Sequence, residues 1–219
     1  MYKRQTDDFG AGDQGMMFGY ACHENESLMP SAIYYSHKIT KALSNARHNG
    51  QNWMGPDGKA QVTVEYSSVN EPARISNVIC STQHSEDLKH NPDEVQKRVV
   101  EIIKPELNDM YDNKTIFKVN PTGNFVTGGP DGDTGVTGRK IIVDTYGGYA
   151  PHGGGAFSGK DCTKVDRSGA YMARYLAKNI VASGVSQNAT IQLSYAIGVK
   201  DPVSLYVYCD GKVRNDISD

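Results

Sequence analysis

The chain has 219 residues, which is enough to bury the core of one domain or of two. Its 23 Lys and Arg residues oppose 25 Asp and Glu residues, so no global field attracts nucleic acid or an anionic membrane, and any basic site must be local. No apolar run approaches the roughly 20 residues that a membrane helix needs. The four cysteines show no CxxC spacing, and we expect a cytoplasmic protein with free thiols.

The two ends of the chain are atypical. The first residues, MYKRQ, look like the translated end of a sequencing-library adapter, so we set residues 1–6 apart as adapter-derived. At the other end, the strand-like VSLYVY is followed by DGKVRNDISD, with no closing element. We expect a chain truncated at both ends; an ordinary flexible terminus is the alternative for the C-terminal end.

Apolar periodicity and stop signals predict the elements in chain order. We expect strands at 16–22, 60–66, 74–83, 116–121, 140–146, 191–199 and 203–208, and helices at 31–48, 92–103 and about 163–182. In the last helix we expect Thr163 and Asp166 to form a capping-box-like start, and one apolar stripe to contain Val165, Gly169, Met172, Leu176 and Ile180. Strand pairs that alternate with single helices predict α+β units, divided by a linker near residues 128–130.

Two glycine-rich loops approach generic nucleotide motifs. Residues 10–15, GAGDQG, fit GxGxxG, but they lead into a strand, whereas the dinucleotide fingerprint opens a helix. Residues 154–160, GGAFSGK, fit GxxxxGK, yet Asp161 follows where a P-loop needs Ser or Thr, which disfavours a P-loop phosphotransferase. Glycine backbone before a helix can still hold an anion near Lys160, and a solvated lysine on a glycine turn is the alternative.

A third glycine-rich segment spans residues 120–140. The adjacent Arg139 and Lys140 can neutralise a polyphosphate, and Phe125 can stack on a base. Each signal alone is weak, because exposed Arg-Lys pairs are usually solvated and loop Phe residues usually pack on a core. Their combination in one loop favours nucleotide binding.

Several of these segments together resemble one family. GAGDQGMMFGYA (10–21) and GGGAFSGKD (153–161) resemble the diagnostic stretches of methionine adenosyltransferases, also called S-adenosylmethionine synthetases. PDGKAQVT, STQHSE, GRKIIVDTYGG, KVDRSGAY, ARYLAKNIVASG and SYAIGV follow in the family order, so the resemblance covers residues 7 to about 207. It implies an α+β fold of repeated βαββαββ-type domains, with the central domain at 7–128 and a truncated C-terminal domain at 129–219.

The resemblance also implies an activity. The family joins the sulfur of L-methionine to C5′ of ATP and cleaves the released triphosphate to phosphate and diphosphate. It implies two Mg2+ ions per site and K+ as cofactors, and a homodimer or homotetramer with active sites between subunits. No nucleic acid and no membrane partner is expected.

Family roles carry over residue by residue. The resemblance assigns catalytic roles to Lys160, Lys140 and Arg139. It assigns ATP contacts to Asp57, Gly58, Lys59, Asn124, Phe125, Asp133, Arg139, Lys140, Ala156 and Lys160. Methionine contacts would come from Asp13, Asp133 and Lys164. Asp166 is a candidate for the metal and phosphate environment, with a simple helix cap as the alternative.

Two departures limit what the resemblance implies. Asn124 stands where the family commonly has a basic residue, which puts one phosphate or ribose contact in doubt. The family's catalytic histidine, magnesium-binding aspartate and potassium-binding glutamate belong to an N-terminal domain, and none of the six histidines here matches that motif. We expect His84 and His152 to be structural and the chain alone to be inactive. The alternative is a partial ATP- or triphosphate-binding module without catalysis.

Overall fold

The computed structural model describes residues 10–213, which divide into two compact units. The four-stranded unit comprises residues 10–30 and 136–213, and the three-stranded unit comprises residues 31–135. Each unit combines one sheet with at least one α-helix, so the chain has the predicted α+β class. Residues 1–9 and 214–219 lie outside the described residues, so the adapter origin expected for residues 1–6 stays a prediction.

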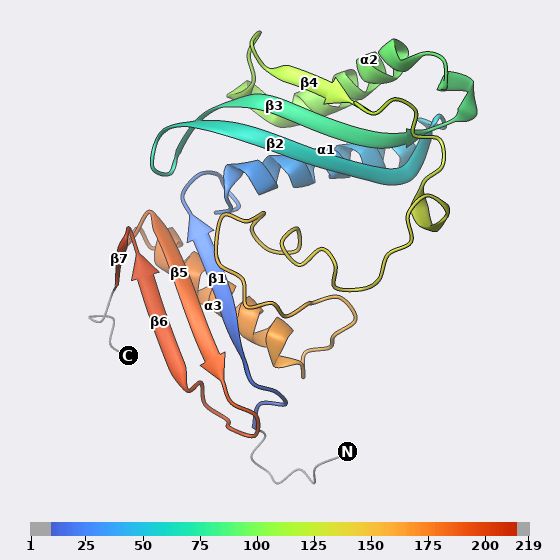
Figure 1. Cartoon of the computed structure of the whole chain (residues 1–219). Coiled ribbons are helices and arrows are strands. Elements are labelled where there is room, and N and C mark those ends of the chain that lie inside the picture. Colours follow the sequence, from blue (N-terminus) through green and yellow to red (C-terminus); the bar gives the residue numbers. More distant parts are fainter. Residues whose placement is uncertain (1–9, 214–219) are drawn as a thin grey trace. The chain divides into compact units, whose positions relative to one another are not determined.

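The four-stranded unit has the sheet order β1-β5-β6-β7. Its elements are β1 (Gly15–Cys22), α3 (Val165–Ala182), β5 (Asn188–Tyr195), β6 (Ser204–Cys209) and β7 (Lys212–Val213). All neighbours are antiparallel, and the register puts Met17 opposite Leu193. Helix α3 runs along one face of this sheet (Figure 1). The sheet therefore pairs a strand from the beginning of the chain with strands from its end.

Helix α3 approaches β1 unusually closely. A Cβ on Gly19 would lie 2.0 Å from the carbonyl carbon of Ala173, so only glycine fits there. The buried face of the helix is correspondingly small: Gly169, Ala170, Ala173, Ala177 and Val181. The predicted stripe was wrong at Met172, which is 52% exposed, because close helix–sheet contact selects small residues over the bulkier ones.

The three-stranded unit has the sheet order β2-β3-β4. Its elements are α1 (Ser31–His48), β2 (Met54–Ser68), β3 (Glu71–His84), α2 (Pro92–Ile103) and β4 (Ile116–Val119), with 3-10 turns η1 (Glu86–Leu88), η2 (Lys104–Met110) and η3 (Gly129–Asp131). Strands β2 and β3 form an antiparallel hairpin, and β4 lies parallel to β3. Among residues 10–213, no helix is long and apolar enough to cross a membrane.

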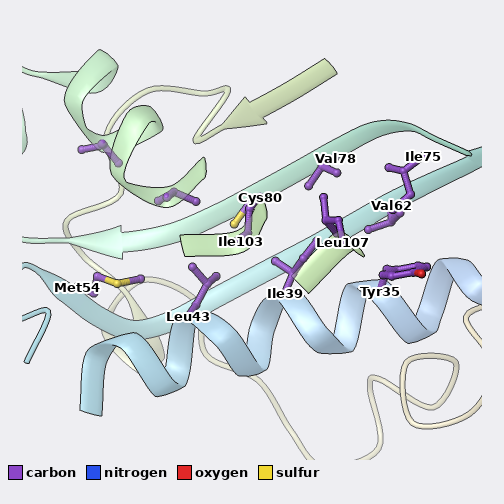
Figure 2. Close-up of a cluster of buried hydrophobic side chains, with 12 residues drawn as sticks. Tyr35, Ile39, Leu43, Met54, Val62, Ile75, Val78, Cys80, Ile103 and Leu107 are labelled. Atoms are coloured by element: carbon purple, nitrogen blue, oxygen red, sulfur yellow. The ribbon is translucent and has the colours of Figure 1, made fainter. Parts of the chain in front are cut away.

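The core of this unit lies between the helices and the sheet. Figure 2 shows Tyr35, Ile39 and Leu43 of α1 directed toward buried residues of β2 and β3. Helix α2 and turn η2 complete the cluster with Val95, Val99, Ile103 and Leu107. Burial raises the pKa of the Cys80 thiol in this core to about 12, which keeps it protonated at neutral pH. All four cysteines are free, as predicted.

Besides the stripe, three local predictions were wrong, one of them at residues 196–199, which were expected in a strand but follow the end of β5. Residues 140–146 form no strand but a series of turns, with Asp144 N–H donating to Lys140 O (2.9 Å) and Gly147 N–H to Ile142 O (2.9 Å). The capping residue of α3 is Lys164, not Thr163, and no side chain caps the helix. Thr163 instead donates to the Asp161 carboxylate from its amide (2.8 Å) and its hydroxyl (2.5 Å), which stabilises the turn before the helix.

The hairpin of the three-stranded unit carries an exposed charge cluster with a defined pH dependence. Arg74 of β3 donates to both carboxylate oxygens of Asp112 (3.0 and 2.9 Å) and to Glu65 (2.7 Å). Hydrogen bonds from Arg74, and then from the backbone N–H of Lys114, lower the pKa of Asp112 to about 2. Because this pKa is depressed on folding, the stabilisation is present above about pH 4 and is lost as the pH falls toward 2.

We therefore expect Asp112→Asn to lower the urea midpoint of the chain at pH 7, by a modest amount because the group is exposed. The difference from the unsubstituted chain should shrink between pH 4 and pH 2, where the wild-type carboxylate becomes protonated. Urea unfolding at a series of pH values measures this. A difference that stays constant down to pH 2 would contradict the assigned ion pair.

Candidate functional site

The loop from residue 146 to residue 160 lies along the free edge of β1 in the four-stranded unit. The buried Tyr146 hydroxyl accepts a hydrogen bond from the backbone N–H of Tyr20 (3.0 Å), and the two rings contact edge to face. A Cβ on Gly153 would lie 1.6 Å from the carbonyl oxygen of Met16, so the loop backbone touches the strand. These contacts cover an edge that would otherwise expose strand hydrogen-bonding groups, and they fix the start of the glycine loop.

Lys160 is held at the start of α3. Its ammonium lies 2.5 Å from the carboxylate of Asp166, and both side chains are about 30% exposed. Arg167 donates to the carbonyl oxygen of Lys160, which fixes the backbone at this position. A Cβ on Gly155 would lie 2.5 Å from the Asp166 Cγ, so the glycine lets the loop close over the carboxylate. The arrangement presents one oriented cation beside the first turn of a helix.

The second basic loop lies against the first one. Gly138 has a φ of +85°, which favours glycine, and a Cβ added there would lie 3.0 Å from the Cβ of Ala156. This contact puts the exposed Arg139 and Lys140 in a segment next to the Ala156–Lys160 loop. Lys164, at the end of that loop, is also exposed. Four predicted phosphate or methionine contacts thus occupy two adjoining loops of one unit.

Asp13 lies in the loop that precedes β1. It is exposed, and its carboxylate accepts a hydrogen bond from the backbone N–H of Gln14 (2.8 Å). Hydrogen bonds link Ala11 with Val199 and with Gly198 (2.7 Å each), which ties this loop to the β5–β6 connection. A Cβ on Gly15 would be 3.6 Å from Asp166, so the loop also borders the Lys160–Asp166 pair.

The described residues do not by themselves form a metal centre. Across residues 10–213, no group of three or more His, Cys, Asp or Glu side chains could hold an ion. Asp166 supplies one carboxylate, and the ammonium of Lys160 already occupies one of its oxygens. A divalent ion needs several oxygen ligands, so Asp166 alone does not fit a complete magnesium site.

In the three-stranded unit, hydrogen bonds fix the loop that carries Asn124 and Phe125. The buried His84 donates its backbone N–H to Phe125 O (2.9 Å), and its Nε2 accepts the Phe125 N–H (3.1 Å). Gln83 donates to Val126 O (2.9 Å). The Asp57 carboxylate accepts the N–H of Gly129 (2.8 Å). The end of β3 and the start of β2 together hold this loop.

Other predicted nucleotide contacts surround the same segment. Gly58 and Lys59 follow Asp57 on β2, opposite Thr82 and Ser81, and both are exposed. A cavity of about 130 Å³ borders Asp57 and Gly58 and is lined on the α1 side by Thr40, Ser44 and Arg47. Asp133 is exposed after η3. Asn124 is exposed and Phe125 is half-buried.

Asn120 is the first anchor of this loop. Its side chain accepts the N–H of the buried Thr82 (2.8 Å) and donates to Thr82 O (3.1 Å), while its own N–H donates to Cys80 O (2.9 Å). Asn120 therefore continues the pairing of β4 with β3 beyond Val119, through its backbone N–H and through its side-chain amide. Its φ of +44° is a conformation that asparagine tolerates better than most residues.

We expect Asn120→Ala to lower the free energy of unfolding by about 2–3 kcal/mol, since two buried backbone groups of Thr82 lose their partners and alanine is strained at positive φ. Asn120→Gly is the matched control, because it removes the same hydrogen bonds without the strain at positive φ. Its free energy of unfolding should be about 1 kcal/mol higher than that of Asn120→Ala. Urea unfolding measures both. Two variants as stable as the unsubstituted chain would contradict the anchoring role.

Sequence reasoning missed the residues that hold the loops. Gln83, Asn120 and Arg167 were assigned no role, and His84 was given only a general structural one. STQHSE contains Gln83 and His84, and the glycine-rich segment 120–140 begins with Asn120, but nothing in sequence spacing indicates that the end of β3 binds the backbone of residues 120–126. The predicted roles of the site residues stay predictions; the structure places them in two loop systems, one in each unit.

Comparisons with known proteins agree on one family. The model described as "S-adenosylmethionine synthetase, central domain" matches residues 8–125, and the model described as "S-adenosylmethionine synthetase, C-terminal domain" matches residues 127–218. The S-adenosylmethionine synthase of Rhodospirillum centenum is 60% identical over 215 residues, which are 95% of this chain and 54% of that protein. The S-adenosylmethionine synthase of Parvibaculum lavamentivorans is 56% identical with the same coverage.

A solved structure supports the same grouping. The "Unusual S-adenosylmethionine synthetase from Campylobacter jejuni" superposes with a TM-score of 0.88 at 41% identity, covering 99% of this chain and 57% of that one. The chain spans about half the length of the curated relatives it matches. The matched models together cover most of the sequence, and the chain therefore belongs to the S-adenosylmethionine synthetase family.

Proposed function

We propose that the chain supplies the central and C-terminal parts of a methionine adenosyltransferase, which forms S-adenosylmethionine from ATP and L-methionine with release of phosphate and diphosphate. The observation that carries the proposal is the oriented Lys160, held at 2.5 Å from Asp166 beside the exposed Arg139, Lys140 and Lys164. Displacement at C5′ leaves a triphosphate, and catalysis requires cations arranged around the leaving oxygens.

The basic residues of the site neutralise the charge of the triphosphate. Lys160, Arg139 and Lys140 neutralise the triphosphate, Arg by paired hydrogen bonds and Lys as a point charge. An arriving triphosphate competes with Asp166 for the Lys160 ammonium, which leaves the Asp166 carboxylate available to a cation. Lys59 contributes a further phosphate contact, and Ala156 lies beside the nucleotide.

Recognition of the two substrates uses the remaining loop residues. Phe125 stacks on adenine, while Asp57, Gly58 and Asn124 border the nucleotide. Asp133 binds the nucleoside and the methionine amino group, Asp13 lines the methionine site, and Lys164 contacts methionine. Asn124 in place of a basic residue removes one charge from the nucleotide site.

Mg2+ and K+ belong to the proposal as cofactors of the complete protein. The described residues offer Asp166 and no complete ligand set, so the other ligands come from elsewhere. We propose a cytoplasmic homodimer or homotetramer with sites shared between subunits.

The chain alone is proposed to bind the triphosphate without turning it over. The second candidate function is a partial ATP- or triphosphate-binding module without catalysis in any form of the protein, favoured by the lack of a metal centre within residues 10–213. The two candidate functions predict different results when the N-terminal part of a relative is added: the first predicts formation of S-adenosylmethionine, and the second predicts none. We call this form the completed protein: the N-terminal part of the Rhodospirillum centenum relative followed by residues 7–219.

Calorimetric titration of the 219-residue chain tests the site. We expect saturable binding of ATP and of inorganic triphosphate, lost in Lys160→Ala, and no S-adenosylmethionine after methionine, Mg2+ and K+ are added. The absence of any binding would contradict the phosphate site. Product from the unextended chain would contradict the proposed dependence on a further domain.

A further inference from the structure

His84 uses both of its ring nitrogens in the three-stranded unit. Its Nδ1 lies 2.9 Å from the carbonyl oxygen of Ser85, and its Nε2 lies 3.1 Å from the backbone nitrogen of Phe125. A carbonyl oxygen can only accept and a backbone N–H can only donate. These partners assign the ring proton to Nδ1, which donates to Ser85 O, and leave the Nε2 lone pair to accept the Phe125 N–H.

The same residue also holds the other side of the Phe125 peptide. The backbone N–H of His84 donates to Phe125 O at 2.9 Å, so the N–H and the C=O of Phe125 both end on His84. His84 is 3% exposed and pairs with Met54 of β2, which places it at the open end of the hairpin, next to the register irregularity between Met54 and Gly58. Gln83 holds the next residue through Val126 O (2.9 Å).

The backbone of Phe125 is held more firmly than burial of the residue would require. Phe125 is only half-buried, whereas its backbone is fixed from two directions by a buried residue. A phenylalanine that served only to fill a core would be positioned by burial of its ring. Here the main chain is fixed by hydrogen bonds while the residue as a whole stays half-buried, which suits a stacking platform for a base.

We propose that His84 is a positioning residue that orients Phe125 for the nucleotide base through its Nε2 lone pair. The inference rests on the proposed function, in which Phe125 stacks on adenine. Nothing in it requires His84 to touch the substrate. Because the platform serves the base and not the phosphates, the loss of this hydrogen bond should affect ATP and leave inorganic triphosphate unaffected.

Two amide substitutions separate this role from simple packing. In His84→Gln, the longer side chain brings its oxygen near the Nε2 position, where it can accept the Phe125 N–H. In His84→Asn, the shorter side chain reaches the Nδ1 position, where its NH2 group can donate to Ser85 O but leaves the Phe125 N–H without its acceptor. Both remove the ring, so a purely structural role predicts similar defects.

The experiment uses the 219-residue chain and two readouts. Amide hydrogen exchange at Phe125 should be about tenfold faster in His84→Asn and within about threefold of the unsubstituted chain in His84→Gln. Calorimetric titration should give an ATP dissociation constant about tenfold higher in His84→Asn, near the original value in His84→Gln, and an unchanged constant for inorganic triphosphate in both.

The outcomes distinguish this inference from the proposed function. Equal defects in the two variants, or no defect in either, would overturn the positioning role. If the unsubstituted chain binds inorganic triphosphate but not ATP, the base platform is wrong while the phosphate site stands. If it binds neither, the proposed function fails for this chain and the platform fails with it, while hydrogen exchange still decides whether His84 holds Phe125.

Discussion

Replacing Lys160 with alanine in the completed protein is expected to lower kcat for S-adenosylmethionine formation by about 10²–10³-fold. The contact of Arg167 with the Lys160 carbonyl oxygen fixes the backbone of Lys160, so the ammonium stays beside the leaving triphosphate once the triphosphate has displaced Asp166. The measurement is steady-state kinetics with ATP and methionine varied in turn. A fall in kcat, rather than a rise in the KM for ATP alone, is expected for a group that acts in the transition state.

Lys89→Ala is the matched control for Lys160→Ala. It removes the same charge from an exposed i,i+3 pair with Glu86 (2.6 Å), which lies in turn η1 and outside the proposed site. Surface pairs of this kind contribute little, so turnover should be unchanged. Equal turnover in the Lys160 and Lys89 variants would remove Lys160 from the catalytic machinery.

Replacing Gly19 with alanine is expected to lower the free energy of unfolding of the four-stranded unit by about 3 kcal/mol or more. The new Cβ would meet the Ala173 carbonyl carbon at 2.0 Å and its oxygen at 2.2 Å, and main-chain atoms of a helix cannot move aside as a flexible side chain can. Since α3 carries Asp166 and follows the Lys160 loop, the same substitution should weaken triphosphate binding. Urea unfolding followed by circular dichroism measures the loss.

Gly135→Ala is the control for this prediction. A Cβ on Gly135 has nothing within 4 Å, and the residue is not at positive φ. Its stability should change by less than about 1 kcal/mol in either direction. A Gly19 variant that is no less stable than the Gly135 variant would show that α3 does not pack on β1 as described.

The parts of the fold that sequence predicted best have strong local signals. Helices α1 and α2 begin and end as expected, because each combines a 3.6-residue apolar period with clear stops such as Asn49-Gly50 and Pro105. Strands β1, β4 and β6 also lie within about two residues of their expected bounds. In these segments the local propensity and the tertiary contacts favour the same structure.

The wrong predictions arise where a tertiary contact overrides the local pattern. Residues 141–143 are β-branched and typical of a strand, yet Gly138, Gly147 and Gly148 around them adopt positive φ and close turns instead. Tyr146, not the aliphatic run, is the buried residue of this segment. The approach of α3 at Gly19 likewise selected an alanine face that no bulky-residue periodicity could indicate.

Pairing between strands far apart in the sequence is the second feature that could not be predicted. Strand β1 pairs with β5, which follows it by more than 150 residues in the sequence; the register runs from Gly15 opposite Tyr195 to Cys22 opposite Asn188. Residues 10–30 therefore lie in one unit with residues 136–213, which sequence order alone does not indicate. Loop composition alone indicated Lys160, Arg139, Lys140 and Phe125, and the family resemblance supplied the other candidate site residues. The hydrogen bonds from Asn120, Gln83 and His84 that fix the loop of Phe125 required a structure.

The most direct test of the central claim is mass spectrometry of the products that the completed protein forms from ATP, L-methionine, Mg2+ and K+, with the 219-residue chain assayed alongside. We expect S-adenosylmethionine, phosphate and diphosphate from the completed protein, and none of these products from the chain alone. A completed protein that is folded and binds ATP but forms no S-adenosylmethionine would contradict the proposed activity and favour a nucleotide-binding module.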